Sequence, residues 1–283
     1  MSDKNIKMVA LDLDGTTLNQ YGRITDRTVA AFKKAMVQGV HIVISTGRTF
    51  QSLPKQLFTI EGLEYVVTSN GAHITELESM ERIYENLLPE ESVAAVVELI
   101  RKKGRAHISV ETFVDGHAYI DKDEYEEIVA NGSTYRDAAY IRDTRNPVPQ
   151  ILDYMMAHKG EIENISLNFE FLEEKAVWRE ELAQIPDLTL TTSFIHNIEM
   201  GGVNTSKGTA LAFLMERLGV SPAELMAVGD SPNDGEMMKL AGLGVAVANG
   251  TEETKAMADY VTASNAEDGV AKAIEKFVLQ SRC

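Results

Sequence analysis

The chain of 283 residues has only one cysteine, and this cysteine is its last residue, Cys283. A single cysteine cannot form a disulfide within the chain, so we expect a protein of a reducing compartment, the cytoplasm. No apolar run has the length of a membrane span, and the polar residues 1–7 lead directly into an apolar segment. We therefore expect neither a transmembrane helix nor a signal peptide, and no membrane partner.

Basic residues are also scarce. The chain has 27 lysines and arginines against 43 aspartates and glutamates, so its net charge is −16. This charge argues against nucleic acid and against an anionic membrane surface as partners. It does not exclude a small phosphorylated substrate, because a bound divalent ion and a few local cations can reverse the potential in one cleft.

The most informative stretch that is present is residues 12–16, Asp-Leu-Asp-Gly-Thr, which directly follows the apolar residues 8–11. The short apolar run predicts a buried strand of a parallel sheet, and ligands of open α/β sheets bind at the carboxyl ends of such strands. If strand geometry continues, Asp12 and Asp14 face the same way at a distance on the order of 7 Å. Like charge buried at this place is costly, so the pair requires a cation.

The first and last parts of the chain alternate strands with helices. Strands are expected at residues 8–11, 40–44, 65–68, 225–228, 244–248 and 260–262, and helices at residues 24–38, 206–218, 234–240 and 269–279. This alternation predicts an α/β fold, a doubly wound, Rossmann-like parallel sheet that is built from two separate pieces of the chain.

The middle of the chain has a different pattern. An Asp115-Gly116 turn between two apolar segments predicts a hairpin, and helices are expected at residues 92–103 and 173–184. Hairpins mixed with helices indicate an α+β unit with an antiparallel sheet. We place this inserted cap at residues 87–193 and the core at residues 1–86 and 194–283. Residues 131–148 show no clear pattern.

Polar residues follow four of the core strands. They are Asp12 and Asp14, Thr46 and Gly47, Asn70 and Gly71, and the group Asp230, Asn233 and Asp234; Lys207 lies in the first turn of a helix. Each has a simpler explanation when taken alone. Asn-Gly and Thr-Gly form turns, most lysines are solvated, and acids at residues 230–234 suit a helix cap. The order and spacing of the whole set are much more specific than any one piece.

With these residues in this order, the whole chain resembles the haloacid dehalogenase-like hydrolase superfamily, and within it the Cof-type phosphatases with a large α/β cap. Residues 12–16 resemble the first motif of this superfamily, residues 44–48 the second, residues 206–208 the third, and residues 229–234 with Met237 the fourth. Thr17 stands where Leu is frequent, and Asn249-Gly250 where Asn-Ala is usual, but neither departure touches a group with a catalytic role.

The resemblance implies a Mg²⁺-dependent phosphatase. A carboxylate is repelled by a phosphate dianion, and Mg²⁺ held by hard oxygen ligands removes this repulsion. Asp12 is the candidate nucleophile, which forms an aspartyl-phosphate, and Asp14 is the candidate acid and base. The implied metal site comprises Asp12, Asp14 (through its carbonyl group), Asp230 and Asp234, although Asp234 is also placed to pair with Lys207.

The implied phosphate site comprises the Leu13 and Gly47 N–H groups, the Thr46 hydroxyl, the Asn233 amide and Lys207. Arg48, Asn70 and Gly71 are further substrate candidates. In the cap, Arg136, Arg142, Arg145 and His117 are candidates for contacts with sugar hydroxyls or a second phosphate, yet each one alone is better explained as a solvated surface residue.

The expected substrate is a small phosphorylated metabolite, with sugar phosphates as the commonest class in the family and nucleotides, flavin mononucleotide and pyridoxal phosphate as further possibilities. Two alternatives to hydrolysis stay open. One is a phosphotransferase or phosphomutase on the same fold, and the other is a catalytically silent sensor of a phosphorylated ligand. The expected assembly is a monomer or a homodimer.

Overall fold

The computed structural model describes residues 5–280, so Cys283 and the first four residues of the polar N-terminus lie outside the described part. The chain forms two compact units. Unit 1 contains the described parts of Met1–Gly47, Leu53–Glu85 and Ser206–Cys283, and unit 2 contains Arg48–Ser52 and Asn86–Thr205. None of the helices within residues 5–280 is both long enough and apolar enough to span a bilayer.

Unit 1 is built on an eight-stranded sheet with the order β14-β13-β12-β1-β2-β3-β4-β5. Its strands are β1 (Met8–Leu11), β2 (His41–Ser45), β3 (Tyr65–Thr68), β4 (His73–Glu76), β5 (Glu81–Glu85), β12 (Leu225–Gly229), β13 (Leu243–Ala246) and β14 (Tyr260–Val261). The pairs from β14 to β3 are parallel, whereas β4 and β5 extend the sheet in antiparallel fashion. The predicted parallel α/β fold is confirmed.

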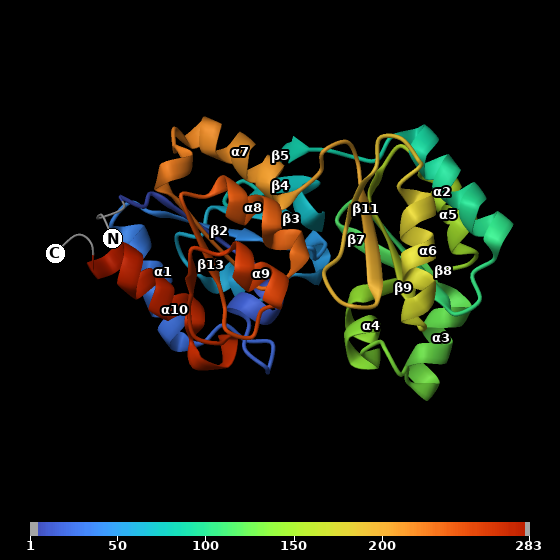
Figure 1. The fold of residues 1–283 in the computed structure, drawn as a ribbon, viewed down its shortest axis with the longest axis horizontal. Helices are drawn as coiled ribbons and strands as arrows, with labels where there is room; N and C mark the ends of the chain where they lie inside the picture. The colour runs from blue at the N-terminus through green and yellow to red at the C-terminus, as the bar shows by residue number, and fades with distance from the viewer. Residues whose placement is uncertain (1–4, 281–283) are drawn as a thin grey trace. The chain divides into compact units, whose positions relative to one another are not determined.

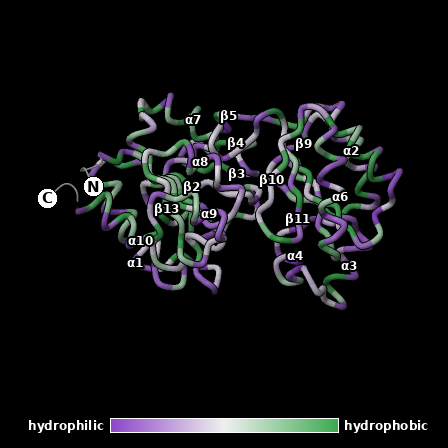
Figure 2. The backbone as a smooth tube through the Cα atoms, viewed as in Figure 1, coloured by the Kyte–Doolittle hydropathy of each residue, from purple (hydrophilic) through white to green (hydrophobic). Residues whose placement is uncertain are grey.

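Helices cover both faces of this sheet. They are α1 (Asp26–Val37), α7 (Lys207–Leu218), α8 (Gly235–Leu240), α9 (Glu252–Met257) and α10 (Gly269–Ile274). Met8 and Ala10 of β1 share a core with Leu211 and Leu214 of α7. Because side chains alternate along a strand, the other residues of β1 face the opposite side, where α1 and α10 lie together (Figure 1). The strands between these layers are hydrophobic, as β2 and β13 show in Figure 2.

Unit 2 has a six-stranded sheet with the order β10-β11-β9-β6-β7-β8. Its strands are β6 (Ile108–Val114), β7 (His117–Asp121), β8 (Arg145–Val148), β9 (Ile162–Phe169), β10 (Thr189–Thr191) and β11 (Asn197–Gly201). All neighbouring pairs are antiparallel except β7 with β8. Asp115 and Gly116 join β6 to β7 with φ values of 48° and 75°, so the predicted Asp-Gly hairpin is confirmed.

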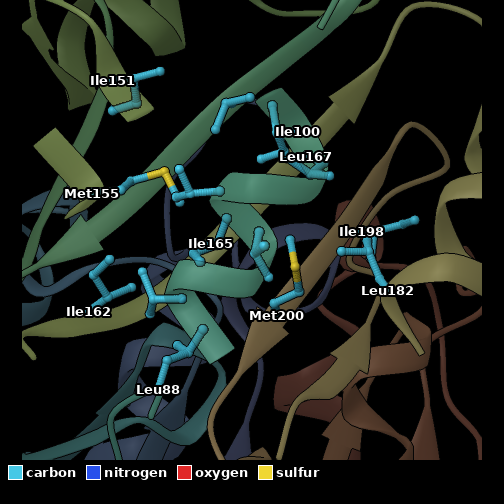
Figure 3. Packing of buried hydrophobic residues seen from close by; sticks show 14 of the residues in the cluster. Leu88, Ile100, Ile151, Met155, Ile162, Ile165, Leu167, Leu182, Ile198 and Met200 are labelled. Carbon is cyan, nitrogen blue, oxygen red and sulfur yellow. The ribbon is translucent and has the colours of Figure 1, made fainter. Parts of the chain in front are cut away.

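Three helices of unit 2 pack on one face of its sheet. They are α2 (Glu90–Lys103), α5 (Ile151–Ala157) and α6 (Leu172–Leu182), and Figure 3 shows the apolar side chains of this core. Trp178 of α6 is buried there, as a core residue. On the other face, Ile120 of β7 packs with Ile128 and Ile141 of α3 (Lys122–Asn131) and α4 (Ala138–Thr144). The segment without a clear sequence pattern therefore contains the end of α3, all of α4 and β8.

The boundary of the insert differs from the prediction. We expected residue 193 to end the cap, but β11 pairs with β9 and keeps the chain in unit 2 up to Thr205. Arg48–Ser52 also belongs to unit 2. The reason lies in the hydrogen bonds of Gln51, whose N–H donates to the Gly116 carbonyl at 2.9 Å and whose Oε1 accepts from Asn146 at 3.1 Å.

Candidate active site

The turn after β1 places Asp12 at the edge of the sheet. The Asp12 N–H donates to the Val228 carbonyl at 3.0 Å, so the strand pairing continues up to the acid, whose side chain is nearly buried. The chain then turns at Gly15, where φ is 77°. A Cβ at this position would lie 2.7 Å from Asp230 Oδ2, so glycine supplies both the backbone angle and the space for a second acid.

Lys207 lies between two of the predicted acids. It is the first residue of α7, and its side chain is completely buried. Its Nζ donates to Asp12 Oδ1 at 2.6 Å and to Asp234 Oδ1 at 2.7 Å. The simpler explanation of Lys207 as a solvated helix residue is therefore wrong. A buried ammonium is tolerated because two carboxylates satisfy it, and they raise the pKa of Lys207 although burial opposes this.

Gly71 holds the start of α7 close to the sheet. Its φ is 100°, and a Cβ there would lie 2.1 Å from the carbonyl oxygen of Ser206, the residue that caps α7. The Asn70-Gly71 pair is thus more than an ordinary turn, since only glycine permits this approach of two backbones next to Lys207.

Asp230 and Asp234 combine a helix cap with a charged site. Asp234 Oδ2 accepts the N–H groups of Asp230 and Ser231 at 2.9 and 3.1 Å, which leaves Oδ1 for Lys207. Asp230 accepts the Thr16 hydroxyl at 2.7 Å and the Ser231 hydroxyl at 2.7 Å. The cap explanation is correct for Asp234, and the same carboxylate also holds the lysine.

One ligand oxygen from each of Asp12, Asp230 and Asp234 lies within 4.8 Å of the others. Burial and then the neighbouring carboxylates raise the pKa of Asp12, against the effect of Lys207, and burial and Asp234 raise the pKa of Asp230. Three carboxylates around one ammonium leave an excess of negative charge, and hard oxygen donors suit Mg²⁺. The arrangement therefore fits a divalent cation. Asp14 is exposed, and its carboxylate is not among the three that converge.

The loops after β2 and β3 bring further predicted residues together. The Asn70 N–H donates to the Thr46 carbonyl at 3.1 Å, and the Asn233 amide donates to Asn70 Oδ1 at 3.0 Å. A Cβ at Gly47 would lie 3.0 Å from Asn70 Oδ1, so the loops are in close contact. Within residues 5–280, Asn70 Nδ2 and Asn233 Oδ1 are buried without hydrogen-bond partners, which is the state expected of groups that bind a ligand.

Two predicted residues remain to be placed. Leu13 follows Asp12 in the turn after β1, and its side chain is buried. Arg48 lies in unit 2, where its Nη1 donates to the Ser52 carbonyl at 2.8 Å. Its guanidinium group also lies 5.2 Å from the ring centroid of Tyr140.

The sequence profile of the haloacid dehalogenase-like hydrolase family matches residues 9–274. The chain belongs to this family. It is 33% identical over 279 residues to the 5-amino-6-(5-phospho-D-ribitylamino)uracil phosphatase YcsE of Bacillus subtilis, with 98% of each chain covered. It is 32% identical to the phosphatase YwpJ of the same organism, over 94% of this chain and 98% of that protein.

Solved structures agree with this assignment. A haloacid dehalogenase-like hydrolase from B. subtilis has a TM-score of 0.81 at 26% identity, with 96% of this chain and 99% of the other covered. A subclass IIB sugar phosphatase, BT4131, has a TM-score of 0.79 at 24% identity over 96% and 98% of the two chains, which supports the fold. The predicted family and its fold are confirmed, and the chain is a hydrolase with many relatives that are named phosphatases.

Sequence reasoning gave no role to several residues that hold the site. Thr16 belongs to the first motif, but its hydroxyl bond to Asp230 depends on a fold that joins distant segments. Asn249 was noted only beside a departure from the family pattern. Its amide donates to the Gly15 carbonyl at 2.7 Å and so fixes the turn after Asp12.

Proposed function

We propose that the chain is a Mg²⁺-dependent phosphatase of the cytoplasm that hydrolyses a small phosphorylated metabolite through an aspartyl-phosphate intermediate. A sugar phosphate is the first candidate for this substrate. The observation that carries this proposal is the position of Lys207 between Asp12 and Asp234, with Asp230 beside them. A carboxylate nucleophile needs this combination of a fixed cation and a further metal-binding acid to approach a phosphate dianion.

In the first step, a carboxylate oxygen of Asp12 attacks phosphorus and the bond to the ester oxygen breaks. Asp14 gives its proton to the departing oxygen, and its exposure leaves it accessible to a substrate and to water. In the second step Asp14 takes a proton from water, which attacks the aspartyl-phosphate and regenerates Asp12. Lys207 stays charged throughout and offsets the negative charge of the transition state.

Asp12 and Asp230, with the Asp14 carbonyl, would hold Mg²⁺, which supplies charge neutralisation for the incoming phosphate. Asp234 would orient this set, because both of its oxygens already serve Lys207 and the loop after β12. The Thr46 hydroxyl, the Leu13 and Gly47 N–H groups and the Asn233 amide would bind phosphoryl oxygens. The unpartnered Asn233 Oδ1 supports a site that is completed by a ligand.

Unit 2, the inserted part, is proposed to select the leaving group. Three relatives from B. subtilis have the name 5-amino-6-(5-phospho-D-ribitylamino)uracil phosphatase, which describes a phosphate on a polyol chain. This chain shares 33%, 27% and 28% of its aligned residues with them. A phosphorylated sugar or polyol is therefore the first class to test.

The test is a panel of sugar phosphates, polyol phosphates, nucleotides, flavin mononucleotide and pyridoxal phosphate, assayed for released phosphate with Mg²⁺ and with EDTA. We expect release that depends on Mg²⁺ and is absent from the Asp12→Asn variant. Activity that persists in EDTA would overturn the metal role. Transfer of labelled phosphate to a sugar acceptor would show a phosphotransferase, and binding without turnover across the panel would show a sensor.

A further inference from the structure

The loop after β1 carries Asp14, the proposed acid and base, at its tip. The backbone angles of Asp14 (φ −76°, ψ 124°) and Gly15 (φ 77°, ψ −13°) are those of a type II turn. The Leu18 N–H donates to the Leu13 carbonyl at 2.8 Å and closes the loop. Closure fixes the two ends, but the tip contains glycine, the residue with the greatest conformational freedom. The position of Asp14 therefore depends on contacts that other segments make with the tip.

Two asparagines from distant loops of unit 1 make such contacts. Asn249 follows β13, and its Nδ2 donates to the Gly15 carbonyl at 2.7 Å. Asn265 follows β14, and its Nδ2 donates to the Leu18 carbonyl at 2.8 Å. The two are linked, because the Asn265 N–H donates to Asn249 Oδ1 at 2.9 Å. We call Asn249 and Asn265 the asparagine bracket, since they hold the loop at its tip and at its last residue.

The asparagine bracket is itself fixed in orientation. Asn249 uses its donor toward the loop and its acceptor toward Asn265, so a rotation of the amide by half a turn would break both hydrogen bonds. Ser264 and Glu267 form a capping box around the turn that contains Asn265. The bracket is therefore ordered by contacts that do not involve the loop after β1.

These hydrogen bonds matter more for position than for stability. Asn249 is exposed and Asn265 is half-buried, and a hydrogen bond near the surface adds little net free energy because water can replace it. Proton transfer, however, requires a donor within hydrogen-bond distance of its acceptor. A displacement of about 1 Å can lower the rate of such a step by about a hundredfold.

We propose that Asn249 and Asn265 are positioning residues for Asp14. By holding Gly15 and the end of the loop, they keep the Asp14 carboxyl group where it gives its proton to the departing ester oxygen. In the same step the bond from Asp12 to phosphorus forms and the bond from phosphorus to the ester oxygen breaks. The inference rests on the proposed function and adds to it two residues that act through the loop.

The experiment compares two phosphate esters that differ in their need for a proton. 4-Nitrophenyl phosphate releases a phenolate with a delocalised charge, whereas benzyl phosphate releases an alkoxide that has to be protonated. The quantity measured is kcat/KM for each ester at saturating Mg²⁺, which reports the first step and not the hydrolysis of the aspartyl-phosphate. A general defect lowers both values, but a misplaced acid lowers chiefly the value for benzyl phosphate.

Single variants test the bracket. Asn249→Ala should lower kcat/KM for benzyl phosphate about tenfold or more and change the value for 4-nitrophenyl phosphate by less than about twofold. Asn265→Ala keeps its N–H for Asn249, so it should have a smaller effect of the same kind. Asn19→Ala is the matched control, because Asn19 Oδ1 accepts the N–H groups of Tyr21 and Arg23 in the next loop. It should keep both values of the parent protein, and thermal unfolding confirms that each variant is folded.

A double variant tests whether the bracket acts through Asp14. Asp14→Asn alone should lower kcat/KM for benzyl phosphate about a hundredfold or more, with much less effect on 4-nitrophenyl phosphate. Asn249→Ala added to Asp14→Asn should cause no further fall, because the group that it positions has no proton to give. A merely structural role would lower both values in either background.

The outcomes separate the bracket from the proposed function. An unchanged benzyl phosphate value in Asn249→Ala, an equal fall for both esters, or a further tenfold fall in the double variant would overturn the bracket. The proposed function would stand in these cases if Asp14→Asn has its expected effect. Equal values for Asp14→Asn and the parent protein would contradict the acid role of Asp14 and the bracket together. Absence of phosphate release from both esters and from the panel of metabolites would contradict the phosphatase, and with it the bracket.

Discussion

The two units each bury a charged cluster, and the clusters have opposite compositions. In unit 1 a single ammonium group, that of Lys207, lies among three carboxylates. In unit 2 the carboxylate of Glu111 lies between two guanidinium groups, those of Arg136 and Arg145. Burial alone would raise the pKa of both Asp12 and Glu111. It prevails at Asp12, whereas Arg136 and Arg145 overcome it and lower the pKa of Glu111 to about 2.

This difference shows that the balance of positive and negative charge in a buried cluster indicates which kind of ligand it binds. A balanced buried ion pair needs nothing more, but an excess of one sign is stable only if a group of the other sign approaches. The excess is negative around Asp12, which fits a metal ion.

The largest expected effect is that of Asp12→Asn. The amide removes the nucleophile, so we expect phosphate release to fall by a factor on the order of 10⁴ or more. It also removes one of three crowded acids, so the thermal unfolding midpoint should not fall by more than a few degrees. Turnover at the rate of the parent protein would contradict the role of Asp12. It would also show that the acidic cluster of unit 1 is not the catalytic site.

Lys207→Met tests the balance of the unit 1 cluster. The variant leaves buried carboxylates without their cation, so we expect a loss of unfolding free energy on the order of 3–5 kcal/mol in urea titrations at pH 7. The rate should fall by several orders of magnitude. Lys239→Met is the matched control, since Lys239 is 61% exposed on α8. Equal stability of the two variants would contradict the role of Lys207 as the counter-charge.

Glu111→Gln tests the unit 2 cluster through pH. The folded pKa of about 2 lies below the ordinary 4.5, so the stabilisation is present above pH 4.5 and is lost as the pH falls toward 2. It amounts to about 3 kcal/mol. Urea titrations should show this loss in the parent protein and not in Glu111→Gln. Glu181→Gln is a control in unit 2, with a side chain that is 43% exposed and paired with Lys103, and it should keep the pH dependence of the parent protein.

Glu124→Gln has the smallest expected effect and the opposite sign. Burial raises the folded pKa of Glu124 to about 7, so the folded state loses stability as the pH rises from 4.5 to 7. The neutral glutamine avoids this loss, and the variant should be more stable than the parent protein at pH 8 by about 1–2 kcal/mol. The two proteins should be equal below pH 4. Glu126→Gln on the same helix serves as the exposed control.

The sequence predicted unit 1 better than unit 2 for a physical reason. Buried parallel strands are short apolar runs, and the polar residues at their ends stand out, so Asp12 and Asp230 were found. Lys207 begins a helix and was found through the third family motif. The edge strand β5 (Glu81–Glu85) was missed because an exposed strand carries charges. In β11, Asn197 and Glu199 are buried on the polar face of the sheet and hide the strand pattern.

The buried arginines beside Glu111 show the limit most clearly. The side chains of Arg136 and Arg145 are only 5% and 9% exposed, so the expectation that they are solvated surface residues is wrong. Arg136 and Arg145 come from a polar segment without periodicity, and their burial depends on Glu111, which is distant in sequence. Arg48 was found through its motif, yet nothing in that motif indicates that it contacts Tyr140 of the insert. Local patterns report secondary structure and chain ends, whereas a buried ion cluster is a property of the tertiary fold.

The backbone contact at Gly71 has a consequence for heredity. A single methyl group there would collide with the Ser206 carbonyl at 2.1 Å and displace the first turn of α7, which carries the lysine. An inherited Gly71→Ala substitution would therefore inactivate the enzyme, although Gly71 has no reactive side chain. A carrier of this substitution would show the same loss of activity as a carrier of a substitution that removes Lys207.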